Sequence, residues 1–238
     1  KSYIAAVLIS AGFAACNRGP VFNVEGEISG AEGKMLYIEH SSIEGVVGLD
    51  STKLSGDGRY HFSEARPEAP DFYRLRVDDR IINFVVDSTE TVNISSDYNT
   101  FSSGYSVTGS ESNVKIKELS LLQADLQAKV NELNKSGMPA GLAQDSLFRM
   151  IESYKNDVKR NYIYKEPDKA SSYFALFQQL NGFMIFNPLS NKEDVKCFAA
   201  VATSLNHNYP HADRSRNLYN MVIKGMKNTR TPQTKTLE

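Results

Sequence analysis

The chain has 238 residues, 41% of them hydrophobic, which is enough for one large or two modest domains and excludes a disordered chain. Its net charge of −1 argues against a nucleic-acid partner, because such proteins usually present a basic surface. The two cysteines, Cys16 and Cys197, are too few for a disulfide framework, and the sequence contains no CxxC motif.

The first sixteen residues have the features of a secretory signal: a basic start, a short apolar run and small residues before a cleavage point. The run is shorter than the roughly 20 residues that span a bilayer. Residues 13–16 (FAAC) resemble the lipobox of bacterial lipoproteins, in which a peptidase cuts before a cysteine whose thiol carries a diacylglycerol. Ala15 supplies the small side chain at the cleaved position, whereas Phe13 departs from the usual leucine. We therefore expect 1–16 to be a lipoprotein signal segment with Cys16 lipidated; the alternative is a buried helix with one cysteine.

Residues 20–110 consist of short segments in which apolar and polar side chains alternate, separated by turns rich in Gly and Asp. This period of two is typical of a half-buried antiparallel sheet, and it is clearest over residues 46–94. The side chains that share one face in two successive segments are Tyr73, Leu75 and Val77, followed by Ile82, Phe84 and Val86. About eight such strands at a spacing of 8–12 residues predict a β-sandwich or an open barrel.

After residue 110 the apolar period changes to three and four, which indicates amphipathic helices. The apolar stripe of the first, long helix consists of Leu119, Leu122, Leu126, Val130 and Leu133. We expect four further helices, over about 143–158 and 168–181, from a capping box at 190–193, and from Asp213 or Ser215 onward. Residues 229–238 are expected to be a linker or tail. The sequence therefore predicts an α+β protein, with an antiparallel β domain (20–110) followed by a helical domain (111–228) of about five helices.

The two parts carry opposite charge. Residues 20–110 hold 7 Lys and Arg against 15 Asp and Glu, a net charge of −8, whereas residues 111–238 hold 18 against 13, a net charge of +5. Surface ion pairs contribute only about 0–1 kcal/mol each, so charge alone does not hold two domains together. We therefore expect a partly apolar seam between a sheet face or edge and the first long helix, which would make the protein one rigid body.

Several of these features together resemble one family of lipoproteins. The segments that carry the resemblance are Cys16, 49–51 (LDS), 56–62 (GDGRYHF), 72–75 (FYRL), 82–87 (INFVVD), 107–110 (VTGS) and 208–210 (NYP). They resemble the N-terminal half of thioredoxin-like (AhpC/TSA-type, thiol:disulfide interchange) lipoproteins of Gram-negative anaerobes, over residues 16–230. In that family a β domain of unassigned function and a helical region precede a thioredoxin domain with a CxxC motif. The sequence has no WCxxC-like run, so the resemblance implies no catalytic residue; the chain is expected to be an N-terminal fragment or a short relative.

Two sets of residues are candidates for thiol or metal chemistry. Cys197 lies beside Lys196, but adjacent residues on a helix do not share a face, so we expect a buried structural cysteine. His207 and His211 have a spacing that suits a metal on a helix. Because Pro210 breaks that helix and no third ligand is near, we expect a surface pair and no metal.

Two further sets are candidates for acid–base chemistry or ligand binding. The carboxylates of Asp50, Asp78 and Asp79 could be read as acid–base pairs, but turn positions are the expected role. Four tyrosines of the helical part could line a ligand groove, although core edges are expected: Tyr154, Tyr162, Tyr164 and Tyr173.

Two functions from different classes remain open. The first is a non-catalytic module of a membrane-anchored periplasmic thioredoxin-like lipoprotein, which acts as a scaffold, binds a partner or dimerises. The alternative is a stand-alone cell-envelope lipoprotein that recognises a glycan or peptide. The absence of Trp weakens the glycan hypothesis, and an exposed aromatic row on a sheet face would favour it.

No constellation of catalytic residues supports an enzyme, and no cofactor is expected. The expected partners are a membrane, through Cys16, and a thioredoxin-like domain or a second copy. No acidic cluster follows Cys16, which favours a periplasm-facing membrane.

Overall fold

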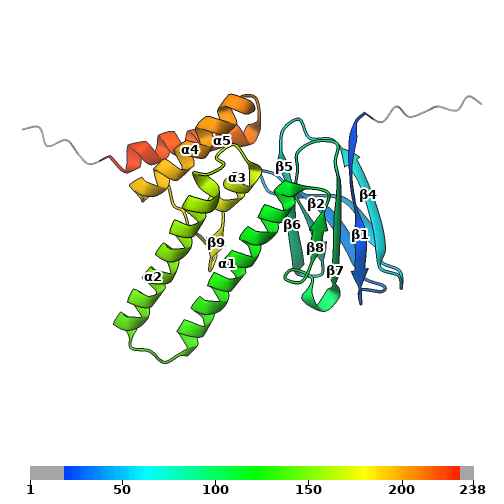
Figure 1. Ribbon diagram of the computed structural model, residues 1–238, viewed down its shortest axis with the longest axis horizontal. Helices are drawn as coiled ribbons and strands as arrows, with labels where there is room; N and C mark the ends of the chain where they lie inside the picture. Colours follow the sequence, from blue (N-terminus) through cyan, green and yellow to red (C-terminus); the bar gives the residue numbers. More distant parts are fainter. Residues whose placement is uncertain (1–18, 231–238) are drawn as a thin grey trace, which may run out of the picture.

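The computed structural model describes residues 19–230, so the expected signal segment with its lipidation site Cys16 lies outside the described residues. Eight strands come first and form two four-stranded sheets, and five α-helices follow (Figure 1). The predicted α+β class is therefore confirmed. The strands belong to two separate sheets that do not close into a barrel, which is the arrangement of the predicted sandwich.

The two sheets pack face to face around a shared apolar core. One sheet has the strand order β4-β1-β7-β8 and the other the order β3-β2-β5-β6. Among the strand pairs of residues 19–230, only β1–β7 is parallel. The strands are β1 (Val21–Ser29), β2 (Met35–Ser41), β3 (Val46–Lys53), β4 (Arg59–Ala65), β5 (Asp71–Val77), β6 (Arg80–Val86), β7 (Thr91–Asp97) and β8 (Ser106–Thr108).

The core of the sandwich follows the period-two pattern. The predicted inner faces of β5 and β6 are buried, from Tyr73 to Val77 and from Ile82 to Val86. Edge strand β3 differs, because Val46, Val47 and Leu49 stay exposed. A regular alternation therefore buries a strand only where the second sheet lies beneath it.

Helix α1 (Glu111–Lys135) covers one open side of the sandwich, because it contacts the edge strands β6 and β8 (Figure 1). Gly109 turns the chain from β8 toward this helix with a φ of +86°, and a Cβ there would lie 2.3 Å from the Thr91 carbonyl oxygen. Only glycine fits both constraints. Within the first turn of the helix, Asn113 is buried, and its side-chain amide bonds both backbone groups of Val85. The Val85 N–H donates to Oδ1 at 2.7 Å, and Nδ2 donates to the Val85 carbonyl at 2.8 Å.

The four remaining helices share an apolar core with α1 (Figure 1), and through Tyr173 and Arg214 they also contact the sheet. They are α2 (Ala140–Val158), which continues into a π-turn at Lys159–Ile163, α3 (Ala170–Leu176), α4 (Lys192–Asn208) and α5 (Asp213–Asn228). A buried ion pair joins α2 to α4, with 2.6 Å between Lys155 Nζ and Asp194 Oδ1. In the predicted stripe of α1, Leu122 is 41% exposed rather than buried.

Two local predictions in the helical part are wrong. The helix expected over 168–181 ends at Leu176, and the chain then forms a hairpin of β9 (Gln179–Leu180) and β10 (Phe183–Met184). Asn181 and Gly182 both have positive φ, of 51° and 81°, which is the backbone of a two-residue hairpin turn rather than a helix end. The cap of α4 is Asn191, whose Oδ1 accepts from two backbone N–H groups, and not Ser190.

The sandwich and the helices share apolar contacts, as expected for a seam. Phe72 on β5 and Val85 on β6 lie opposite each other in register, and both belong to the core of the helical part. Their side chains point away from the sandwich core, where Tyr73 and Phe84 lie. The outer face of this sheet is therefore buried against the helices at one end.

Candidate functional site

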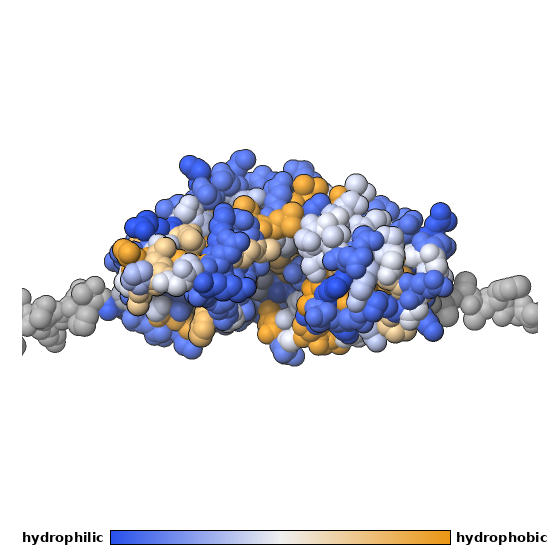
Figure 2. All heavy atoms as spheres, turned by 90° about the horizontal axis from the view of Figure 1, so that it is seen from below, coloured by the Kyte–Doolittle hydropathy of each residue, from blue (hydrophilic) through white to orange (hydrophobic). Residues whose placement is uncertain are grey.

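A cleft of about 470 Å³ lies where the outer face of the β3-β2-β5-β6 sheet meets α3 and α5. We call it the sheet–helix cleft. Figure 2 shows apolar side chains gathered along the junction of the two halves, beside a recess. The cleft is lined by Ser41, Ser42, Ile43, Phe72, Asn83, Tyr173, Phe174, Phe177, Gln179, Arg214 and Asn217. Its volume lies within the range of about 300–1,000 Å³ that is common for ligand pockets.

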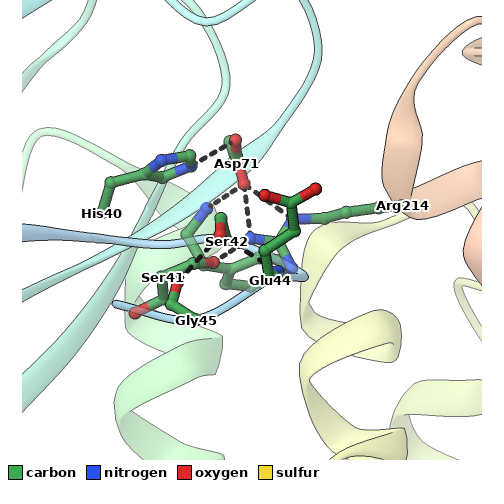
Figure 3. Close-up of polar contacts among 8 residues, drawn as sticks. His40, Ser41, Ser42, Glu44, Gly45, Asp71 and Arg214 are labelled. Carbon is green, nitrogen blue, oxygen red and sulfur yellow. Dashed lines mark hydrogen bonds and ion pairs between the residues drawn. The ribbon is translucent and has the colours of Figure 1, made fainter. Parts of the chain in front are cut away.

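At one end of the cleft, Asp71 joins the sandwich to the helices (Figure 3). Its Oδ2 accepts a hydrogen bond from His40 Nε2 at 2.7 Å, and its Oδ1 accepts from Arg214 Nε at 2.6 Å. Arg214 also donates to the carbonyl of Ser41. We call His40, Asp71 and Arg214 the Asp71 cluster. Because it pairs β2 and β5 with the first turn of α5, it fixes the orientation of α5 against the sheet.

The Asp71 carboxyl is half-buried, and its pKa reflects two opposing effects. Burial raises the pKa, but the hydrogen bond from His40 and the charge of Arg214 lower it by more, so the net pKa lies below the ordinary value of 3.8. Asp71 is therefore ionised at neutral pH. A carboxylate only accepts hydrogen bonds, so His40 Nε2 carries the donated proton.

Aromatic rings surround the guanidinium of Arg214 and form one wall of the cleft. The guanidinium lies 4.8 Å from the ring centroid of Phe72 and 5.4 Å from that of Tyr173, within cation–π distance. Phe72 stacks on Phe174, and Tyr173 stacks on Phe177. The guanidinium of Arg214 therefore already interacts within the protein, with the Asp71 carboxylate and with the rings of Phe72 and Tyr173.

A second hollow of about 270 Å³ continues the cleft toward α1 and shares four of its lining residues: Asn83, Phe174, Phe177 and Gln179. Several amide side chains nearby already bond the backbone. Gln123 donates to the Gln179 carbonyl, and Gln178 donates to the Phe174 carbonyl. In contrast, the side-chain amides of Asn83, Gln179 and Asn217 have no hydrogen-bond partner within the described chain. The cleft therefore offers three free amide groups and apolar ring edges, and no free charge.

Cys197 is buried, as predicted. Its Sγ lies 3.3 Å from the hydroxyl oxygen of Tyr164. Burial raises the pKa of the Cys197 thiol and outweighs the opposing effect of the Tyr164 hydrogen bond. A buried thiol of raised pKa is a poor nucleophile.

The other predicted candidates do not come together. His207 is in the last turn of α4 and His211 lies in the following loop, both exposed. Asp78 lies at a turn, as expected, and accepts hydrogen bonds from Lys34 and Tyr98. Asp50 does not lie at a turn: it is within β3, where its carboxylate accepts from the Ser51 N–H. The four tyrosines named as possible groove residues also lie in different places. Tyr173 lines the cleft, Tyr154 and Tyr162 are buried elsewhere in the helical core, and Tyr164 is half-exposed.

Of the residues that line the cleft, the sequence singled out only Tyr173, as a possible groove residue, and it missed the others. Phe72 and Val85 lie in runs of consecutive apolar residues, 72–73 and 84–86, and such runs indicate a strand buried on both faces. That signal could have placed the seam. The pairing of Asp71 with Arg214 spans 143 positions and leaves no local signal.

Within residues 19–230 no helix combines the length and apolar character needed to cross a bilayer. The same residues contain no cluster of three or more His, Cys, Asp or Glu side chains that could hold a metal ion.

Residues 22–116 match the family described as a domain of unknown function (DUF4369). The match includes nearly all of the eight-stranded part and the first turns of α1, with Asn113.

No curated protein matches the chain. Among solved structures, (S)-allantoin synthase is similar at a TM-score of 0.29 and 11% identity, over 40% of this chain and 45% of that one. The chain thus covers under half of that protein. Klebsiella pneumoniae 5-hydroxyisourate hydrolase is similar at a TM-score of 0.26 and 13% identity, over 39% of this chain and 100% of that one. Both scores are too low to support an inference about activity.

Proposed function

We propose that residues 19–230 form a rigid, non-catalytic spacer in the N-terminal part of a membrane-anchored, periplasm-facing lipoprotein of the thioredoxin-like kind. One observation carries this proposal. The start of β1 and the end of α5 lie at opposite ends of the long axis of the molecule (Figure 1). A chain anchored before β1 would therefore present whatever follows α5 at the far end of the body.

Three contacts support the rigidity that a spacer needs. The side chains of Phe72 and Val85 belong to the helical core, the Asn113 amide bonds the edge of β6, and the Asp71 cluster pairs two strands with α5. Together these contacts involve strands β2, β5 and β6 and helices α1, α3 and α5. Relative motion of the halves would have to break apolar, hydrogen-bonded and ionic contacts together.

The non-catalytic part of the proposal is supported by the thiol inventory of the described residues. Thiol–disulfide exchange needs an attacking and a resolving sulfur within reach of each other. Within residues 19–230 the single thiol is Cys197, which is buried. The alternative function, a stand-alone envelope lipoprotein that binds a peptide or glycan, is supported by the free amide groups of the sheet–helix cleft.

The spacer proposal predicts one fixed distance between the two ends of the body. Pulsed electron paramagnetic resonance between two spin labels measures this distance. The labels are attached at two exposed positions: Ala65, which pairs with Val21 on β1, and Lys227 on α5. The protein used is Ala65→Cys/Lys227→Cys with Cys16→Ser. We expect one narrow distance distribution that is the same at about 0.1 M and about 1 M salt, where the Debye length falls to about 3 Å. Arg214→Ala should broaden it and Arg216→Ala, an exposed neighbour on α5, should not. A broad or salt-dependent distribution in the parent protein would refute a rigid spacer.

The Asp71 cluster predicts a defined pH dependence of stability. Because the folded-state pKa of Asp71 is lowered, its contribution is fully present above the ordinary value of 3.8 and is lost as the pH falls through the folded value. We expect Asp71→Asn to lower the free energy of unfolding by about 1–3 kcal/mol near neutral pH, since Arg214 loses its charged partner. The difference from the parent protein should shrink below about pH 4.

Chemical denaturation at several pH values measures this difference. Asp79→Asn is the matched control, because Asp79 is exposed in a neighbouring turn. If the free energies of unfolding of Asp71→Asn and the parent protein differ by the same amount from neutral to acid pH, the carboxylate charge of Asp71 contributes nothing to stability.

The proposed anchor predicts a processed N-terminus. Protein isolated from membranes of the native host should lack residues 1–15 and carry acyl chains on Cys16, which mass spectrometry of the intact protein detects. Cys16→Ser should move the protein out of the membrane fraction, because the diacylglycerol on the Cys16 thiol is the group that supplies the membrane affinity. Membrane-bound protein that retains Lys1 would contradict the proposal.

A further inference from the structure

We propose that the sheet–helix cleft binds an extended, uncharged polypeptide segment of a partner protein that carries an aliphatic or aromatic side chain. This inference goes beyond the spacer function and does not rest on it. Three features of the cleft carry it: its free amide groups, its lack of free charge and the arrangement of its rings.

The amide groups are of the kind that this molecule uses elsewhere to bind backbone. Asn113 bonds both the N–H and the carbonyl of Val85, and Gln127 accepts from the Asn181 N–H at 3.0 Å. A side-chain amide matches a peptide unit because each presents one acceptor beside a donor. In the cleft the amides of Asn83, Gln179 and Asn217 lack such a partner within the described chain. An extended backbone would supply donors and acceptors to all three.

The charge of the lining selects against charged segments. Arg214 is the one charged residue that lines the cleft, and its guanidinium is bonded to Asp71 and to the Ser41 carbonyl. A carboxylate bound there would compete with Asp71, and a lysine would lie beside a cation without a free counter-charge. A charged segment would therefore lose hydration without gaining a partner.

The rings favour an apolar side chain over a sugar. Stacking of a sugar needs an open aromatic face, whereas the rings here stack on each other. The centroids of Tyr173 and Phe177 are 4.7 Å apart, and those of Phe72 and Phe174 are 6.1 Å apart. Phe177 also meets Phe198 edge to face. The rings are thus engaged with one another, and the apolar surface that they contribute to the cleft is one against which an aliphatic or aromatic side chain packs.

Nuclear magnetic resonance of the full-length chain tests this proposal. The probes are a pool of acetylated, amidated pentapeptides of Ser, Thr, Val, Leu and Phe, a matched pool that contains Asp and Lys, and the neutral sugars cellotetraose and chitotetraose. We expect the uncharged pool to shift the side-chain amide signals of Asn83, Gln179 and Asn217, and the charged pool and both sugars to leave them in place. Shifts caused by the sugars but not by the peptides, or by no probe at about 5 mM, would overturn the proposal.

Two variants locate the binding. Gln179→Ala and Asn217→Ala should each weaken the best peptide of the pool by about 2- to 10-fold, as expected for one lost hydrogen bond. Asn220→Ala is the matched control, because Asn220 is an exposed amide on the same helix and does not line the cleft. Equal affinities for Asn217→Ala, Gln179→Ala and Asn220→Ala would place the peptide elsewhere and overturn the assignment of this site.

Discussion

The contact between Asn113 and Val85 is the constraint on which the arrangement of the two halves depends. Strand β6 is the edge of its sheet, and an edge strand presents unpaired N–H and carbonyl groups. Where such groups are buried without a partner, each costs about 1–3 kcal/mol. Helix α1 buries this part of the edge, and the Asn113 amide replaces the missing neighbour strand by bonding both groups of Val85. Covering the edge with a helix is therefore possible only because an amide lies at this position.

The other contacts between the halves follow from this placement of α1. With the helix against β6 and β8, the end of the outer sheet face that carries Phe72 lies beneath α3, and the two rings of Phe72 and Tyr173 stack. Arg214 of α5 then reaches Asp71 beside the same rings. The sheet–helix cleft opens directly beside these contacts, since Phe72, Tyr173 and Arg214 also line it. A single geometry thus produces both the rigid junction and the site proposed for a peptide.

Much of the fold could be predicted from local patterns, because the period of the apolar residues reports which face of each element is buried. The alternation at Tyr73–Val77 and the stripe through Leu119 and Val130 both predict buried faces that the structure contains. At Asn181 and Gly182 the apolar pattern predicts a helix end, because a glycine after an apolar helix matches one, whereas the structure has a hairpin turn. Asn followed by Gly is the stronger signal, since it is typical of a two-residue hairpin turn.

The candidate site could not be predicted in the same way. Its residues come from segments near 41, 72, 83, 174 and 214, and each segment has its own local role in a strand or helix. Nothing in the sequence around Asp71 or Arg214 indicates that the two side chains form a pair, because only the fold brings them together. The consecutive apolar residues at 84–86 were the one local sign that the outer face of β6 is covered. They indicate that something packs there, but not which helix.

We infer that the sandwich and the helices unfold as one unit because α1 completes the edge of β6. Native-state hydrogen exchange in Asn113→Ala tests it most directly, with Asn131→Ala, an exposed asparagine on the same helix, as the control. The account predicts that Asn113→Ala lowers the opening free energy of amides in β1 and β7 and of amides in α4 by the same amount, about 2 kcal/mol or more, and that Asn131→Ala changes both by less than about 0.5 kcal/mol. A loss of protection in α4 alone, with the sandwich unchanged, would show that the two halves are stable independently and would contradict the account.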